Sequence, residues 1–170
     1  MKTVLLLRHA KSSWDNPLLG DFERPLAPRG RKAAPRMGRF MARNGLVPDR
    51  VLCSGARRAV ETLGLASEDW QEVQVETLDE IYHASPSSLL QLIRALPQGE
   101  ESVLLVGHNP TFEELASRLA GSGKEEALEA LSQKYPTGAL AILDFHVGTW
   151  AELEPGKGFL RDFIRPKTLK

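Results

Sequence analysis

Cysteine is nearly absent from this sequence: Cys53 is the single one, so the chain cannot form an internal disulfide. An excess of one charge sign is missing too, because 22 Lys and Arg residues balance 22 Asp and Glu residues. That balance argues against dedicated binding to nucleic acid or to a membrane surface. Long apolar runs are also lacking. The run Val4–Leu7 leads straight into charged residues and fits neither a signal peptide nor a membrane span, so we expect a cytoplasmic protein.

Three common site motifs are also missing. Cys53 and Arg58 are one residue too close for the Cys-X5-Arg loop of cysteine phosphatases, because Ala59 occupies the required position. The segment ending in Lys124 lacks the first glycine of a phosphate-binding P-loop, because that position is Arg118. No spacing of His, Cys, Asp or Glu suggests metal ligands. We therefore expect neither a metal nor a cofactor.

What the sequence does contain is enough apolar material for one folded unit. It has 170 residues, of which 42% are hydrophobic, and this size predicts a single domain spanning residues 1–170. Short apolar segments alternate with helical patterns. We predict strands at Lys2–Leu7, Arg50–Cys53, Val73–Val75, Ser102–Val106, Ala139–Phe145 and Thr149–Leu153, and helices near residues 28–43, 54–66, 86–96, 109–120 and 124–134. This alternation predicts a three-layer α/β/α sandwich with a largely parallel central sheet.

Several residues predict where the helices begin and end. Ser54 and Ser85 are expected to cap two helices, and Asn109 followed by proline is expected to start a third. Pro35 lies inside the first helical pattern, which predicts a kink or a later start. Residues 12–28 are rich in Pro, Gly, Asp and Asn and predict a long loop, whose length suggests a function beyond connection.

Charged and imidazole side chains follow three of the predicted strands. Arg8 and His9 follow the first strand, Arg58 lies shortly after the second, and His108 follows the strand that ends at Val106. Open parallel sheets place their ligand sites at the carboxyl ends of strands, and helix N-termini there favour anions. One histidine at a strand end is usually structural, and one arginine in a first helical turn is usually solvated. Their recurrence at three junctions favours a shared site for a phosphoryl group.

These residues belong to an ordered set of motifs that resembles the histidine phosphatase superfamily, in the branch of small SixA-type phosphohistidine phosphatases. The matching pieces are Leu7–Ser12, Asp21–Leu26, Arg29-Gly30, Cys53-Ser54, Arg58-Ala59, Thr62, Val106–Pro110, Pro136–Leu140 and Arg165–Lys167. The resemblance covers nearly the whole chain in the expected order. It implies the phosphoglycerate mutase-like fold of that superfamily.

The resemblance also implies a mechanism. His9 would be the nucleophile and would form a covalent phosphohistidine intermediate, while Arg8, Arg58 and His108 would hold the phosphoryl oxygens. The family spacing, with Arg four residues after Ser and directly before Ala, selects Arg58 and not Arg57. Arginine suits this role because its fork pairs two oxygens and keeps its charge. No metal would be needed.

The leaving group distinguishes branches of this superfamily. An alkoxide needs a general acid, whereas imidazole, with a reference pKa of about 6.5, leaves more easily. Glu80 lies where other branches carry a glutamate, so it is a candidate substrate-binding residue and acid, or else a loop carboxylate. His83 has the same two interpretations. Asp15 replaces the asparagine of mutases and weakens a mutase assignment, and Asp21 with Arg24 is expected to brace the loop.

We therefore predict a phosphatase that acts on phosphohistidine, with a phosphorylated protein as partner and with neither nucleic acid nor membrane. Its small size supports an open site. The alternatives are a phosphatase for small phosphate esters or phosphoramidates, and a non-catalytic phosphate-binding docking module. A basic stripe on the first predicted helix is either a solvated face or a docking surface for an acidic protein; it consists of Lys32, Arg36, Arg39 and Arg43.

Overall fold

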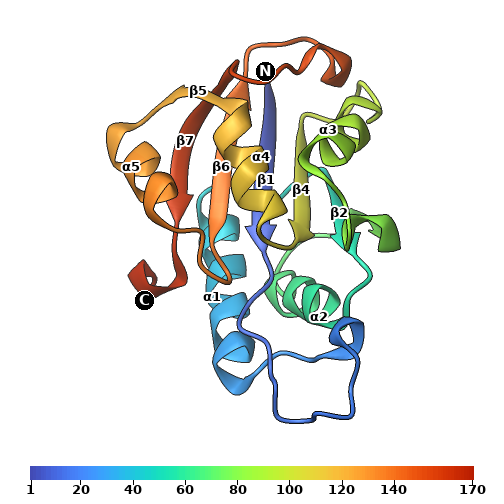
Figure 1. The fold of residues 1–170 in the computed structure, drawn as a ribbon. Helices are drawn as coiled ribbons and strands as arrows, with labels where there is room; N and C mark the ends of the chain where they lie inside the picture. The colour runs from blue at the N-terminus through green and yellow to red at the C-terminus, as the bar shows by residue number, and fades with distance from the viewer.

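A seven-stranded sheet forms the centre of the protein in the computed structural model, which describes residues 1–170 (Figure 1). The strands lie in the order β3-β2-β4-β1-β6-β7-β5. Their bounds are β1 Lys2–Arg8, β2 Arg50–Ser54, β3 Gln74–Leu78, β4 Ser102–Gly107, β5 Ala120–Gly123, β6 Leu140–Phe145 and β7 Gly158–Ile164. Only β6 runs antiparallel to its neighbours, β1 and β7. The prediction of a largely parallel sheet is confirmed.

Helices cover both faces of this sheet. They are α1 Pro28–Arg43, α2 Arg57–Ala66, α3 Pro86–Arg94, α4 Thr111–Leu119 and α5 Glu125–Gln133, with short 3-10 turns η1 Asp21–Glu23, η2 Asp79–Ile81, η3 Trp150–Glu152 and η4 Pro166–Thr168. Alternate residues of a strand point to opposite faces. Accordingly Val4 and Leu6 pack in the core under α3, α4 and α5, whereas Leu5 and Leu7 pack under α1 and α2. The three-layer sandwich is confirmed, and none of its helices is long and apolar enough to span a bilayer.

The helix-start predictions were partly right. Asn109 does not cap α4, because that helix begins at Thr111 and Pro110 is its N-cap. Ser85 caps α3 and its Oγ accepts the N–H of Ser88 at 3.1 Å. The alternative of a later start for the first helix is wrong, because α1 begins at Pro28 and continues through Pro35. Ser54 does not cap a helix: it ends β2, and its Oγ accepts the N–H of Ala56 at 3.2 Å. This turn delays α2 until Arg57.

Near the carboxyl terminus the strand assignments need correction. Residues Thr149–Leu153 are not a strand, because the turn η3 buries the indole of Trp150 there. The true partner of β6 is β7, which the sequence analysis missed because charged residues interrupt its alternation. It missed β5 as well, whose Gly and Ser residues give no strand signal and which pairs with β7 alone.

The strand order determines which residues can meet. β4 lies between β2 and β1 and is parallel to both, so the carboxyl ends of these three strands share one edge of the sheet. β7 points the same way as β1, since each is antiparallel to β6. Figure 1 shows the long loop after β1 and the C-terminus at this same end, opposite the N-terminus. We call this end the carboxyl edge.

Candidate active site

A pocket of about 260 Å³ opens at the carboxyl edge. Its walls contain Arg8 and His9 from the end of β1, Arg58 from the first turn of α2 and His108 from the residue after β4. The structure thus brings together the four residues that the sequence analysis predicted to share a site. The other lining residues are Lys11, Ser12, Trp14, Arg24, Asn109 and Thr137.

The imidazole of His9 is buried and held in one tautomer. Its Nδ1–H donates to the carbonyl oxygen of Ala10 at 2.7 Å, which leaves the lone pair on Nε2. That nitrogen accepts the Nε–H of Arg58 at 3.4 Å. Burial, together with the charges of Arg58 and Arg8, lowers the pKa of His9 to about 3. At neutral pH the ring is therefore uncharged, and its Nε2 carries the lone pair that a nucleophile needs.

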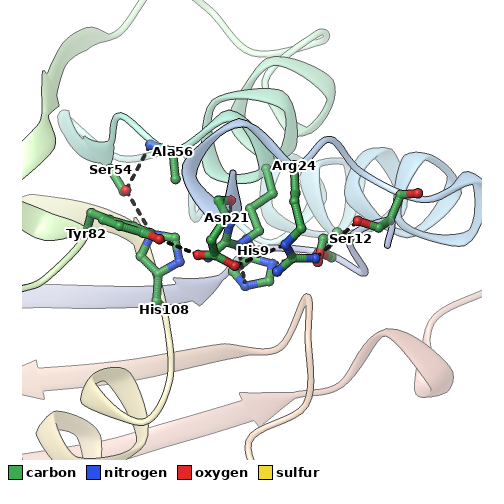
Figure 2. A network of polar contacts seen from close by, with 11 residues as sticks. His9, Ser12, Asp21, Arg24, Ser54, Ala56, Tyr82 and His108 are labelled. Atoms are coloured by element: carbon green, nitrogen blue, oxygen red, sulfur yellow. Dashed lines mark hydrogen bonds and ion pairs between the residues drawn. The ribbon is translucent and has the colours of Figure 1, made fainter. Parts of the chain in front are cut away.

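Arg58 is held in place by Asp21. Its Nη1 donates to the Asp21 carbonyl oxygen at 2.6 Å and its Nη2 to the carboxylate at 2.9 Å. The same carboxylate accepts the Nε–H of Arg24 at 3.0 Å and the hydroxyl of Tyr82, so it stands at the centre of the network in Figure 2. These contacts, that of Tyr82 first, hold the pKa of Asp21 well below its usual range. The predicted pairing of Asp21 with Arg24 is confirmed, and the carboxylate also orients the second arginine.

His108 lies against His9 with the ring centroids 5.3 Å apart, and the ring of Tyr82 meets it at 85°. Its Nε2 is hydrogen-bonded to the Oγ of Ser54 at 2.8 Å. Burial, together with the charge of Arg58, lowers the pKa of His108 to about 4. Ser54 therefore serves the site by orienting an imidazole instead of capping a helix.

Two buried side-chain nitrogens have no hydrogen-bond partner within the chain: Nε of Arg8 and Nδ1 of His108. They are the only buried side-chain nitrogen or oxygen atoms of which this is true, and both belong to residues that line this pocket. Arg8 is anchored through Nη1, which donates to the carbonyl oxygen of Tyr135 at 2.8 Å. Because buried polar atoms are nearly always paired, these two nitrogens favour an anion in this pocket, where His108 donates through Nδ1–H if its Nε2 accepts the hydroxyl of Ser54.

Comparisons with known proteins agree with this geometry. Residues 4–85 match the model of the histidine phosphatase superfamily, branch 1. A candidate phosphohistidine phosphatase SixA from Agrobacterium tumefaciens is 34% identical and superposes with a TM-score of 0.83, over 97% of this chain and 98% of that one. The chain belongs to the histidine phosphatase superfamily. An uncharacterized protein of Mycobacterium tuberculosis is 38% identical over 95% of this chain and its own full length. The protein histidine phosphatase SixA in complex with tungstate, at 23% identity, shares the fold with a TM-score of 0.73, each chain being covered to 98%.

Membership of this superfamily supports phosphatase activity, and the structure shows which predicted residues lie outside the phosphatase pocket. Glu80 and His83 are both exposed and line a separate pocket of about 360 Å³. Asp15 is exposed on the long loop and does not line the pocket of His9. The structure therefore does not bring Glu80 into the group formed by Arg8, His9, Arg58 and His108.

Cys53, next to the superfamily's Ser54 position, is buried in the core under α1 and α2. Burial raises the pKa of its thiol to about 12. A thiol of this kind is not ionised at neutral pH and is no nucleophile. This agrees with the spacing that excluded a cysteine phosphatase loop.

Three residues at or next to the pocket of His9 were not predicted individually as site residues, although Thr137 lies in the matching piece Pro136–Leu140. Tyr82 contacts both Asp21 and His108 from the segment after η2. Trp14 is exposed and stacks on Arg24, whose Cζ lies 3.5 Å from the ring centroid. Thr137 reaches the pocket from the loop before β6. All three lie in loops, where neither periodicity nor capping patterns mark a side chain as part of a site.

Proposed function

We propose that this protein hydrolyses phosphohistidine, on a protein substrate, through a covalent phosphohistidine intermediate on His9. The Nε2 lone pair of His9 attacks phosphorus while the bond from phosphorus to the substrate imidazole breaks. A proton on the other ring nitrogen of the substrate lets it leave as neutral imidazole. Arg8 and Arg58 neutralise the charge of the phosphoryl oxygens, which is the main demand of phosphoryl transfer, and the neutral imidazole of His108 donates a hydrogen bond to them. Water then attacks the phosphorus on His9, releasing inorganic phosphate and the free imidazole. These groups supply the charge stabilisation without a metal.

The observation that carries this proposal is the presence, in one pocket, of a neutral imidazole with its lone pair on Nε2 and of two residues that each have an unpartnered nitrogen. His9 presents a neutral Nε2, fixed by the hydrogen bond from Nδ1 to Ala10. Arg8 Nε and His108 Nδ1 are buried without a partner beside it. A nucleophile next to open anion-binding positions is the arrangement that an in-line attack on a phosphoryl group requires.

The leaving group favours a phosphoramidate over a phosphate ester. An alkoxide leaving group needs a proton from a general acid, whereas imidazole leaves readily. The pocket walls carry guanidinium, ammonium, imidazole, amide, hydroxyl and indole groups, and Glu80 lies at a different pocket. This distribution suits a substrate whose leaving group departs with little help.

The test compares two substrates under the same conditions. A phosphohistidine peptide and the alkyl ester glycerol 3-phosphate, whose leaving group is an alkoxide, are offered to the wild-type protein, and released phosphate is measured. We expect the peptide to be hydrolysed with a kcat/KM far above that for the ester. Equal activity on both would assign the protein to small phosphate esters, and activity on neither would favour a non-catalytic phosphate-binding module.

A further inference from the structure

Another pocket lies beside the pocket of His9, which we call the catalytic pocket, at the carboxyl edge. Its volume is about 330 Å³ and four of its nine lining residues are cationic: Arg29, Lys134, Arg165 and Lys167. No acidic residue lines it, and one hydrophobic residue does. In a chain whose formal charge is zero, this is a local concentration of positive charge without its counter-charge. We call these four residues the basic pocket.

The four cations have no ion-pair partner within the chain. Some arginines elsewhere are paired, such as Arg50 with Glu76 and Glu100, and Arg161 with Asp144. None of the basic-pocket residues takes part in such a pair. Like charges that are gathered without a partner repel one another, and an anion bound among them removes that repulsion.

The basic pocket is fixed to the catalytic pocket by the backbone. Thr137 lines both of them. The N–H of the next residue, Gly138, donates to the carbonyl oxygens of Arg8 at 3.0 Å and His9 at 2.9 Å. Pro166 packs so closely on Gly138 that an added Cβ would lie 2.8 Å from its Cγ. A protein substrate whose phosphohistidine is bound at His9, and whose chain continues toward Thr137, therefore passes over the basic pocket.

Positive charge continues from there along α1. A third pocket adjoins the C-terminal turn η4 and is lined by Arg36, Arg39, Arg43 and Lys170. Three of these belong to the basic stripe that the sequence singled out on the first helix. The two pockets together form a basic surface that is too extended for one small substrate, and its side chains are largely exposed. Exposed, flexible cations suit the carboxylates of an acidic protein surface better than a single buried phosphate.

We propose that the basic pocket binds carboxylates of acidic residues that flank the phosphohistidine on the protein substrate. This proposal rests on the proposed function for the identity of the substrate. The pocket selects substrates by charge around the phosphorylated residue and takes no part in the chemical step at His9. Its contribution is electrostatic, so it weakens as salt shortens the screening length to about 8 Å at physiological ionic strength.

The kinetic test uses two phosphohistidine peptides that differ only in their flanking residues, Asp and Glu in one and Asn and Gln in the other. The variant Lys134→Gln/Lys167→Gln removes two exposed charges of the basic pocket. Its matched control, Arg118→Gln/Lys157→Gln, removes two exposed charges at the opposite edge of the sheet, where Gly156 N–H meets the Arg118 carbonyl oxygen. We expect the variant to lose about tenfold in kcat/KM on the acidic peptide and less than about twofold on the neutral one, with the control unchanged.

Two kinetic results would overturn this inference: equal turnover of both peptides by the wild type, or an equal loss on both peptides in the variant. A wild type that hydrolyses neither peptide would instead refute the proposed function. Binding then decides the inference by itself. A fluorescein-labelled acidic peptide without phosphate should bind the wild type and the control alike, and the variant about tenfold more weakly, by fluorescence anisotropy at low salt. The inference would be refuted if an RNA oligomer of equal charge bound the wild type more tightly than the acidic peptide does. It would also be refuted if the variant bound the acidic peptide as tightly as the wild type.

Discussion

Replacing Asp21 by asparagine tests how the site holds its second arginine. The carboxylate accepts from Arg58 Nη2 at 2.9 Å, from Arg24 Nε at 3.0 Å and from Tyr82. An asparagine offers one acceptor oxygen and turns an NH2 donor toward one of the two guanidiniums. A hydrogen bond to a charged group contributes about 1.5–3 kcal/mol when buried. The Asp21 side chain is 46% exposed, so solvent screening reduces this to about 1–1.5 kcal/mol.

That loss corresponds to about a tenfold lower kcat/KM on a phosphohistidine peptide, since 1.4 kcal/mol is a factor of ten. The effect stays moderate because the Asp21 carbonyl oxygen keeps its bond to Arg58 Nη1 at 2.6 Å. We expect the melting temperature to fall by about 2–4 °C. Glu23→Gln is the matched control, because it removes one exposed charge from the same 3-10 turn. Unchanged kcat/KM in Asp21→Asn, or an equal loss in Glu23→Gln, would refute the reasoning.

Three further predictions concern pH, packing and substrate contact. His9 and His108 have pKa values of about 3 and about 4 in the fold and stay neutral there, whereas in the unfolded chain they are protonated near pH ~6.5. The free energy of unfolding therefore falls as pH drops from 7 to 5, by up to about 2.7 kcal/mol per pH unit. Urea titrations that give the same free energy of unfolding across this range would contradict this. Gly138 has φ +77° and no room for a Cβ, whereas Gly45 has φ +67° and lies in open space. Gly138→Ala should therefore lower stability by about 2 kcal/mol more than Gly45→Ala, as measured by thermal melting. The indole of Trp14 is exposed and lines the pocket of His9. Trp14→Ala should therefore raise KM for a phosphohistidine peptide several-fold and keep the melting temperature within about 3 °C of wild type. An unchanged KM would count against a contact with substrate.

The grouping of Arg8, His9, Arg58 and His108 could be predicted because each follows a strand that the sequence marks clearly. Apolar runs define β1, β2 and β4, and parallel strands bring whatever follows them to one edge. The tautomer of His9, the proposed nucleophile, could not be predicted in this way. It depends on a hydrogen bond to the neighbouring Ala10 carbonyl oxygen, whose direction only the folded backbone determines.

The errors arose where one local pattern allowed two structures. Ser54 before a helical segment is a good cap by composition, yet its hydroxyl makes a turn with Ala56 and orients His108. Thr149–Leu153 has strand-like composition, but Trp150 is held in a turn by its Nε1–H bond to the Glu100 carbonyl oxygen and by the ammonium of Lys2 over its ring. In both cases contacts distant in sequence decided between the alternatives.

The basic pocket illustrates a different limit. Arg29 lies in the first turn of α1, Lys134 follows α5, and Arg165 and Lys167 belong to the C-terminal segment. No pattern within a sequence window connects these segments. They meet because β7 is parallel to β1 and because Gly138, in the loop before β6, allows Pro166 to pack against it.

The measurement that tests the central claim most directly is chemical trapping of the intermediate. The wild-type protein and His9→Ala are each mixed with a phosphohistidine peptide, quenched in alkali within one turnover and digested for mass spectrometry. The mechanism predicts one acid-labile phosphoryl group on the wild-type peptide that contains His9, and neither label nor turnover in His9→Ala. Turnover by His9→Ala at the wild-type rate, with the phosphoryl group absent from His9 in the wild type, would contradict it.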